Sequence, residues 1–237
     1  MSDGEQGKKY ETNLPINRKQ LRQRWQSGER FEFYLFYGHN QKFQQVDTSC
    51  LSQWFERDFS VDGVEYATAE HWMMAEKARL FHDDYMLESI LDAAGPKEAK
   101  ALGRKVRGFS QAMWEQHRFE IVRQGNYAKF IQNEDLKKFL LATAQSQSYD
   151  QKMVAEPKAT YKFGKQQSSP AGETDSKTDS NVILVEAAGR DVIWGIGLGQ
   201  HNPKAQDPFQ WRGHNLLGFA LTLVREQLAN IQPEEWS

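Results

Sequence analysis

The chain has 237 residues, a formal charge of −2 and a mean hydropathy of −0.76. This length fits one large domain or two small ones and permits a substantial core. The small net charge excludes a general attraction to nucleic acid or membranes, although a local basic site stays possible. The single cysteine, Cys50, excludes an intramolecular disulfide and suits a reducing compartment.

The N-terminal segment shows no targeting signal. Residues 1–15 are polar, lack the apolar stretch of a signal peptide and are expected to be disordered. No run in the chain approaches the ~18 apolar residues that span a bilayer. We therefore expect a cytoplasmic protein without a membrane partner, with the nucleus as the alternative compartment.

The first third of the chain predicts a helix, a strand, a hairpin and a second helix. Residues 16–28 are basic and helix-prone, and the aromatic run at 31–37 indicates a buried strand. Asp62-Gly63 lies between two short β-like arms in residues 59–66, and this pair favours a hairpin turn. Thr68 is expected to cap a helix that ends near Phe81.

Helices dominate the rest of the chain. They are expected near residues 83–95, 96–106, 111–131, 134–144 and 213–229. Short strands are expected at 181–189 and 191–194, with a glycine loop at 194–199. The predicted fold class is α+β, mainly helical: one compact domain over residues 16–237 with a few short strands. Residues 165–180 form a polar surface insertion in this prediction.

Glu70 and Lys77 are the first candidates for chemistry. They are seven residues apart on one predicted helix, so they share a face and lie about 10.5 Å apart along its axis. Met74 lies between them, and the apolar residues around them indicate that much of this helix is buried. A carboxylate and an amine so placed can flank a ligand of nucleoside size. The competing interpretation is a solvated helix face with unpaired charges.

Two later segments are candidate ligand loops. Residues 186–199 combine Glu186, Asp191 and Trp194 with glycines whose amides can approach a phosphate closely, as at Gly195 and Gly197. Their spacing is not that of a dinucleotide-binding fingerprint, and a structural turn is an equal explanation. In the second segment, Trp211 and Asn215 precede the last helix, whose N-terminus suits an anion. No histidine or cysteine spacing indicates a metal.

The order of these motifs resembles that of the NADAR family, the YbiA-like N-glycosidases. The motifs are LSQWF at 51–55, DGVEYATAEHWMMAEKA at 62–78, LVEAAGRDVIWGIGL at 184–198 and WRGHNLLGFAL at 211–221. The resemblance covers nearly the whole chain. Trp72 stands where many relatives carry Tyr or Phe, and the insertion at 165–180 is longer, so it could change which substrate fits.

The resemblance implies a mainly helical α+β fold that hydrolyses the bond between ribose C1 and an amino nitrogen of a heterocycle. Candidate substrates are ADP-ribosyl-guanine, free or in a nucleic acid, and ribosylamino-pyrimidine phosphates of riboflavin biosynthesis. The expected catalytic residues are Glu70, Lys77 (as a Schiff-base amine) and Asp191. The expected substrate-binding residues are Phe36, Trp72, Glu186, Trp194, Gly195, Gly197, Trp211 and Asn215. No cofactor or metal is expected, and the oligomeric state is not predicted.

A non-catalytic module that binds NAD or ADP-ribose is the main alternative. It would use the same aromatic and glycine residues but would not need the Glu70 carboxylate. A purely structural protein is a third interpretation. Glu70→Gln distinguishes the first two, because a binding module keeps its affinity whereas an enzyme loses turnover.

Overall fold

The computed structural model describes residues 12–41, 45–145 and 181–231. The predicted surface insertion at 165–180 and residues 1–11 lie outside these ranges. The helices and strands are α1 (Arg18–Gln26), β1 (Glu32–Phe36), η1 (Thr48–Leu51), β2 (Phe59–Val61), β3 (Val64–Tyr66), α2 (Ala69–Leu80), α3 (Asp84–Leu91), α4 (Pro96–Gly103), α5 (Gln111–Gln132), α6 (Glu134–Ala142), β4 (Val182–Glu186), η2 (Pro203–Gln206) and α8 (Leu216–Ala229). The mainly helical α+β class is confirmed.

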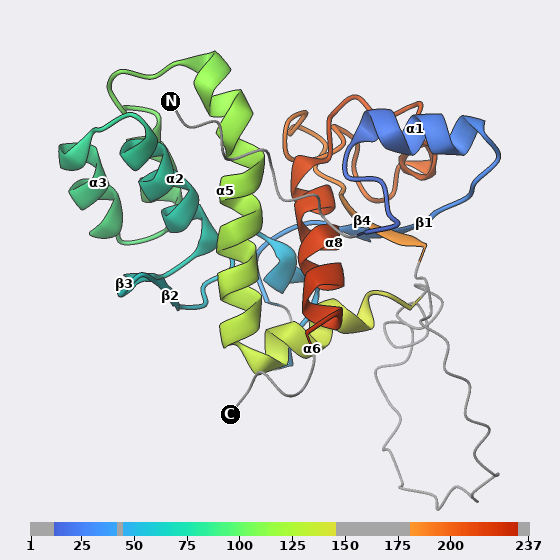
Figure 1. Ribbon diagram of the computed structural model, residues 1–237, viewed down its shortest axis with the longest axis horizontal. Coiled ribbons are helices and arrows are strands. Elements are labelled where there is room, and N and C mark those ends of the chain that lie inside the picture. The colour runs from blue at the N-terminus through green and yellow to red at the C-terminus, as the bar shows by residue number, and fades with distance from the viewer. Residues whose placement is uncertain (1–11, 42–44, 146–180, 232–237) are drawn as a thin grey trace, which may run out of the picture.

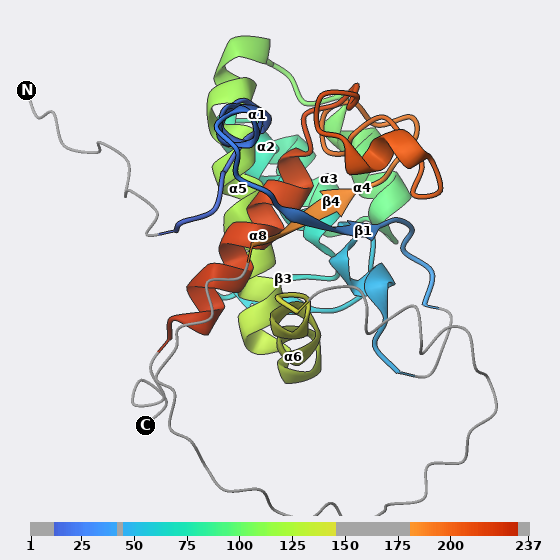
Figure 2. The same cartoon turned by 90° about the vertical axis from the view of Figure 1, so that its right-hand side faces the viewer.

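Helices α5 and α8 pack together along the middle of the molecule (Figure 1). Helices α2, α3 and α4 contact one another, and α2 also packs on α5. On the other side, β4 packs on α8, as the turned view in Figure 2 also shows. Within the described residues, no helix is both long and apolar enough to cross a membrane.

The strands form two small sheets. Strand β1 pairs in parallel with β4, and this register places Phe36 opposite Glu186. Strands β2 and β3 form the predicted antiparallel hairpin. Asp62 and Gly63 both have positive φ, at 51° and 77°, as this turn requires. The hairpin leads directly into α2, whose N-cap is Thr68 as predicted.

Two sequence predictions need correction. Residues 191–194 were expected to be a strand, but they form bends, because the Asp191 side chain accepts the backbone N–H groups of Ile193 and Trp194 at 2.8 and 2.7 Å. Such Asp turns compete with strand pairing. The ordered chain also begins before residue 16: Leu14 is buried in the smaller of two hydrophobic cores, together with Leu21 of α1.

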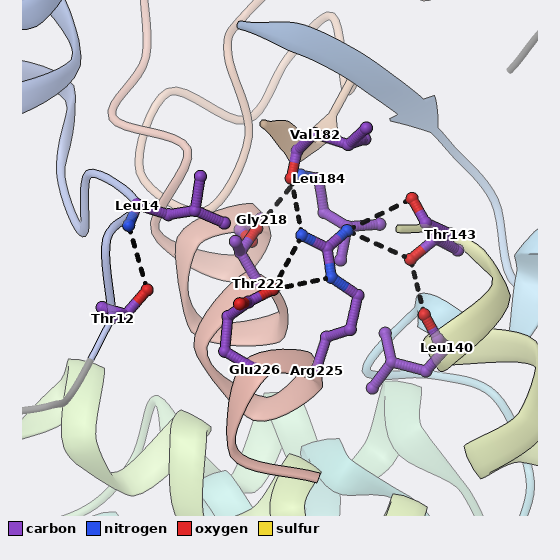
Figure 3. A network of polar contacts seen from close by, with 10 residues as sticks. All are labelled: Thr12, Leu14, Leu140, Thr143, Val182, Leu184, Gly218, Thr222, Arg225 and Glu226. Atoms are coloured by element: carbon purple, nitrogen blue, oxygen red, sulfur yellow. Dashed lines mark hydrogen bonds and ion pairs between the residues drawn. The ribbon is translucent and has the colours of Figure 1, made fainter. Parts of the chain in front are cut away.

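A buried arginine joins three elements on the β4 side of α8 (Figure 3). Arg225 of α8 is 1% exposed. Its guanidinium donates to the carbonyl of Val182 in β4 at 2.6 Å and to that of Thr143, the C-cap of α6, at 3.2 Å. Glu226 is its acidic partner at 3.1 Å. The strand and both helices are therefore held by one side chain.

Candidate active site

Three carboxyl groups from separate parts of the chain lie within electrostatic reach of one another. Glu70 comes from the first turn of α2, Glu186 from the last residue of β4, and Asp191 from the loop that follows β4. Burial is the main cause that raises the pKa of Glu186, to about 8, and the charges of Asp191 and Glu70 raise it further. The structure thus brings together three of the residues predicted from sequence.

The fold holds Glu70 in place from two sides. Thr68 caps α2 by accepting the backbone N–H of His71, so the helix begins at a defined residue. The backbone N–H of Glu70 itself donates to the carbonyl of Gln53 at 2.9 Å. The Glu70 side chain is 2% exposed, and this burial raises the pKa of its carboxyl group.

Lys100 and Trp54, which were not among the predicted site residues, lie against Glu70. The Nζ atom of Lys100 is 3.8 Å from Glu70 Oε1, and it lies 5.6 Å from the centre of the Trp54 ring. Both side chains lower the pKa of Glu70, Lys100 by its charge and Trp54 as a hydrogen-bond donor. Arg104 acts in the same direction as Lys100. Glu70 is therefore a buried acid with two cations and an indole beside it.

Two buried carboxylate oxygens at this site have no hydrogen-bond partner among the described residues. They are Glu70 Oε1 and Glu186 Oε2. Lys100 is too far from Glu70 Oε1 for a hydrogen bond. Buried polar atoms are nearly always satisfied, so each exception requires an explanation, and a functional role is one of the recognised ones. We call Glu70, Glu186, Asp191, Lys100 and Trp54 the acidic site.

Lys77 lies on α2 as predicted, seven residues after Glu70. Met74, between them in the sequence, packs directly on Gly103 of α4. Lys77 donates to the carbonyl of Gly103 at 2.7 Å and lies 4.3 Å from the centre of the Phe109 ring. Burial lowers the pKa of its amine. A ligand flanked by Glu70 and Lys77 stays a prediction.

Trp72 and Trp211, two of the predicted substrate-binding residues, pack inside the protein. The Trp72 indole donates to the carbonyl of Ile121 in α5 at 2.7 Å, and its ring lies against Gly125 of the same helix. The Trp211 indole donates to the carbonyl of Ala205 at 2.8 Å in the smaller core. Each buried N–H is thus satisfied by the backbone, and both rings have structural roles.

The other predicted binding residues surround Glu186. Phe36 is buried opposite it in the sheet. Asn215 accepts the Glu186 backbone N–H at 2.9 Å and donates to the carbonyl of Leu184, so its amide fixes the strand end. Trp194 is half-buried against the larger core.

The glycine loop after β4 is closely packed. The Gly197 N–H donates to the carbonyl of Asp191 at 2.9 Å and is therefore already used within the loop. At Gly195, a Cβ atom would lie 2.7 Å from the Glu186 carbonyl, so this position has no room for a side chain. In the described parts of the chain, no group of three His, Cys, Asp or Glu side chains is arranged to hold a metal.

Comparisons with known proteins identify the family of the chain. Residues 35–149 and 150–229 match the NADAR domain. The chain is 34% identical over 204 residues to N-glycosidase R617 of Acanthamoeba polyphaga mimivirus, covering 84% of this chain and 98% of that one. It is 27% identical over 183 residues to N-glycosidase YbiA of Escherichia coli, covering 77% and 81%. The NMR structure of E. coli YbiA superimposes with a TM-score of 0.55 and 26% identity, covering 91% and 94%.

Proposed function

The chain belongs to the NADAR domain family, and from this membership we propose that it is an N-glycosidase that acts at the acidic site. The bond cleaved joins ribose C1 to an amino nitrogen of a heterocycle. The observation that carries the proposal is that two buried oxygens, Glu70 Oε1 and Glu186 Oε2, have no hydrogen-bond partner in the described part of the chain. Two carboxyl groups in different environments are what glycoside hydrolysis uses.

The two environments assign different roles to the two acids. Glu186, with a pKa of about 8, is protonated at neutral pH and can donate its proton to the leaving nitrogen. The C1–N bond then breaks, its electron pair stays on nitrogen, and positive charge develops on the ribose. Burial raises the pKa of Glu70 as well, and Lys100, Trp54 and Arg104 oppose this rise. In the proposal, the ionised Glu70 carboxylate stabilises the positive charge on the ribose or takes a proton from the attacking water. Asp191 is the further acid of the site.

The proposed substrates are phosphorylated ribosyl compounds. ADP-ribosyl-guanine, free or in a nucleic acid, and ribosylamino-pyrimidine phosphates both contain the bond in question. The cations Lys100 and Arg104 suit a phosphate, and the half-buried Trp54 ring suits a flat heterocycle. Trp54 is thus a further candidate for stacking, beside Trp194.

Glu70→Gln tests whether the protein is an enzyme. It should reduce release of free base by about 10²-fold or more while substrate binding is kept, because the amide retains the shape but not the charge. Mass spectrometry of free base, with ADP-ribosylated guanosine and ribosylamino-pyrimidine phosphate as substrates, measures turnover. Glu76→Gln, on the same helix but paired with Arg79, is the control. A wild-type chain that binds either compound without releasing base would instead be a binding module.

A covalent route through a lysine is part of the proposal. An N-ribosylamine can open its ring to an imine between C1 and the amino nitrogen of the heterocycle. A lysine amine adds to C1 and displaces that nitrogen, which takes up a proton and leaves with the heterocycle, and water then hydrolyses the Schiff base that remains on the lysine. Lys77 was expected to be this amine from the sequence, and its lowered pKa suits it. Lys100 is the amine that lies beside Glu70.

Borohydride added during turnover distinguishes the two lysines. Reduction of a Schiff base leaves the sugar on one lysine, and peptide mass spectrometry identifies which one. We expect an adduct that disappears in either Lys77→Arg or Lys100→Arg, but not in both. Full activity of both variants, with no adduct in the wild type, would remove the covalent route and leave the carboxylates to act alone.

A further inference from the structure

A hollow lies between α1 and the loop before α8, and none of the three carboxyl groups lines it. Its volume is about 470 Å³, which is in the range of small-molecule pockets. Arg18, Lys19 and Arg22 of α1 line one side, and Phe209 and His214 line the other. No acidic side chain is among the lining residues. We call this hollow the α1 groove.

The positive charges of the α1 groove have backbone carbonyls as their partners. Among the residues that the structure describes, no carboxylate forms an ion pair with Arg18, Lys19 or Arg22. Arg18 donates instead to the carbonyl of Gly213 at 2.7 Å, and Arg22 to that of Pro208 at 2.9 Å. The pKa of Arg18 is lowered by burial and by the charge of Arg22. Like charges held together without a counter-charge favour binding of an anion.

The opposite wall of the groove offers a flat ring. Phe209 is 41% exposed, although an aromatic ring of this size is usually buried, and the Arg22 guanidinium lies 5.4 Å from its centre. Glu115, an acid that raises the pKa of His214, has its own partner in Arg118 at 3.8 Å. The groove therefore combines three cations with an exposed aromatic platform.

We infer that the α1 groove is a binding site for a nucleotide unit, whose phosphate contacts Arg18, Lys19 and Arg22 and whose base stacks on Phe209. Cations that follow a phosphate and a ring that stacks on a base are the two elements of single-strand recognition. A free nucleotide has the same chemistry as one unit of a strand. This site requires no turnover, so it stands or falls separately from the N-glycosidase activity.

Fluorescence anisotropy of the full chain with a short labelled oligothymidylate tests the site. Lys19 is exposed and its side chain makes no hydrogen bond with another described residue, so Lys19→Gln removes charge without disturbing the fold. It should lower the slope of log affinity against log salt by about 0.7, the contribution of one single-strand phosphate contact. Phe209→Ala should weaken binding about tenfold through lost stacking. Lys138→Gln, on the exposed face of α6, is the control and should change neither quantity.

Competition with ADP separates the two sources of the ligand. If ADP displaces the oligonucleotide at a comparable phosphate concentration, the natural ligand of the groove is a free nucleotide. If only an unlabelled strand displaces it, the ligand is a nucleic acid. The inference is overturned if neither probe binds, if Lys19→Gln and Phe209→Ala leave binding unchanged, or if Lys138→Gln weakens it as much as Lys19→Gln does.

Discussion

At Glu186, burial and the negative charges of Asp191 and Glu70 act in the same direction, because each of them raises the pKa of its carboxyl group. Its pKa is about 8 in the folded protein, against an ordinary value of 4.5. A raised pKa means that the protonated carboxyl stabilises the fold and that the ionised one costs free energy. This contribution is fully present below about pH 4.5 and is lost as pH rises through about 8.

Glu186→Gln should therefore stabilise the protein at alkaline pH. Glutamine keeps the size of the side chain but cannot ionise, so near pH 9 the variant should exceed the wild type in free energy of unfolding by on the order of a few kcal/mol. The difference should shrink towards zero as the pH approaches about 4.5. Urea denaturation across this range measures it. A difference that is independent of pH would show that Glu186 titrates normally.

Individual site residues were predictable where local signals identify them. Glu70 was predicted because the Thr68 cap fixes the start of α2 and apolar neighbours indicate a buried helix. Lys100 was missed because it reaches Glu70 from another helix, 30 positions along the numbering, and periodicity reports only neighbours on one helix. Trp54 lies in the motif LSQWF, on which the family resemblance rests. Nothing in the sequence shows, however, that its side chain points towards Glu70.

At the scale of elements, the contact between α2 and α4 determines the partners of Glu70 and of Lys77. Gly103 allows α4 to approach Met74 closely, and this approach places Lys100 at Glu70 and gives Lys77 a carbonyl partner. Element boundaries were largely predictable, since caps and turn residues such as Thr68 and Asp62-Gly63 are local signals. The docking of one helix on another was not, because it depends on the absence of a side chain at Gly103.

Gly103→Ala should loosen this contact. The added Cβ would lie 2.0 Å from Met74 Sδ and 3.1 Å from Met74 Cβ, so the helices or the methionine must shift. We expect a loss of about 1–3 kcal/mol in the free energy of unfolding. In a Met74→Ala background the same substitution should cost at least about 1 kcal/mol less, because the clashes with Sδ and Cγ are gone and only the 3.1 Å approach to Cβ is left. Equal costs in both backgrounds, measured by urea denaturation, would exclude Met74 as the partner.

At the scale of the whole molecule, the ratio of helical to β-like segments predicted the fold class. It did not predict how these segments pack on one another. The pairing of β1 with β4 joins positions 32–36 to 182–186, and no turn between them specifies it. The apolar residues of both strands predict that the strands are buried, but they do not show which strand pairs with which. This long-range pairing brings Glu186 to the end of a sheet whose neighbouring loop carries Asp191. The site is consequently a product of tertiary packing more than of any single motif.

Arg225 is the side chain on which that packing should depend most. It joins α8 to β4 and to the end of α6, and it is almost fully buried. Arg225→Leu would leave the carbonyls of Val182 and Thr143 without this donor in an apolar setting, at about 1–3 kcal/mol each. We expect a loss of about 3–5 kcal/mol in the free energy of unfolding.

Lys138→Leu on α6 removes an exposed cation, 3.6 Å from Glu134, and should cost less than about 1 kcal/mol. If chemical denaturation gave similar losses for both variants, the other contacts of β4 with the helices, such as the hydrogen bond from Leu184 N–H to Thr222 of α8, would suffice. Arg225 would then be dispensable to the assembly that forms the acidic site.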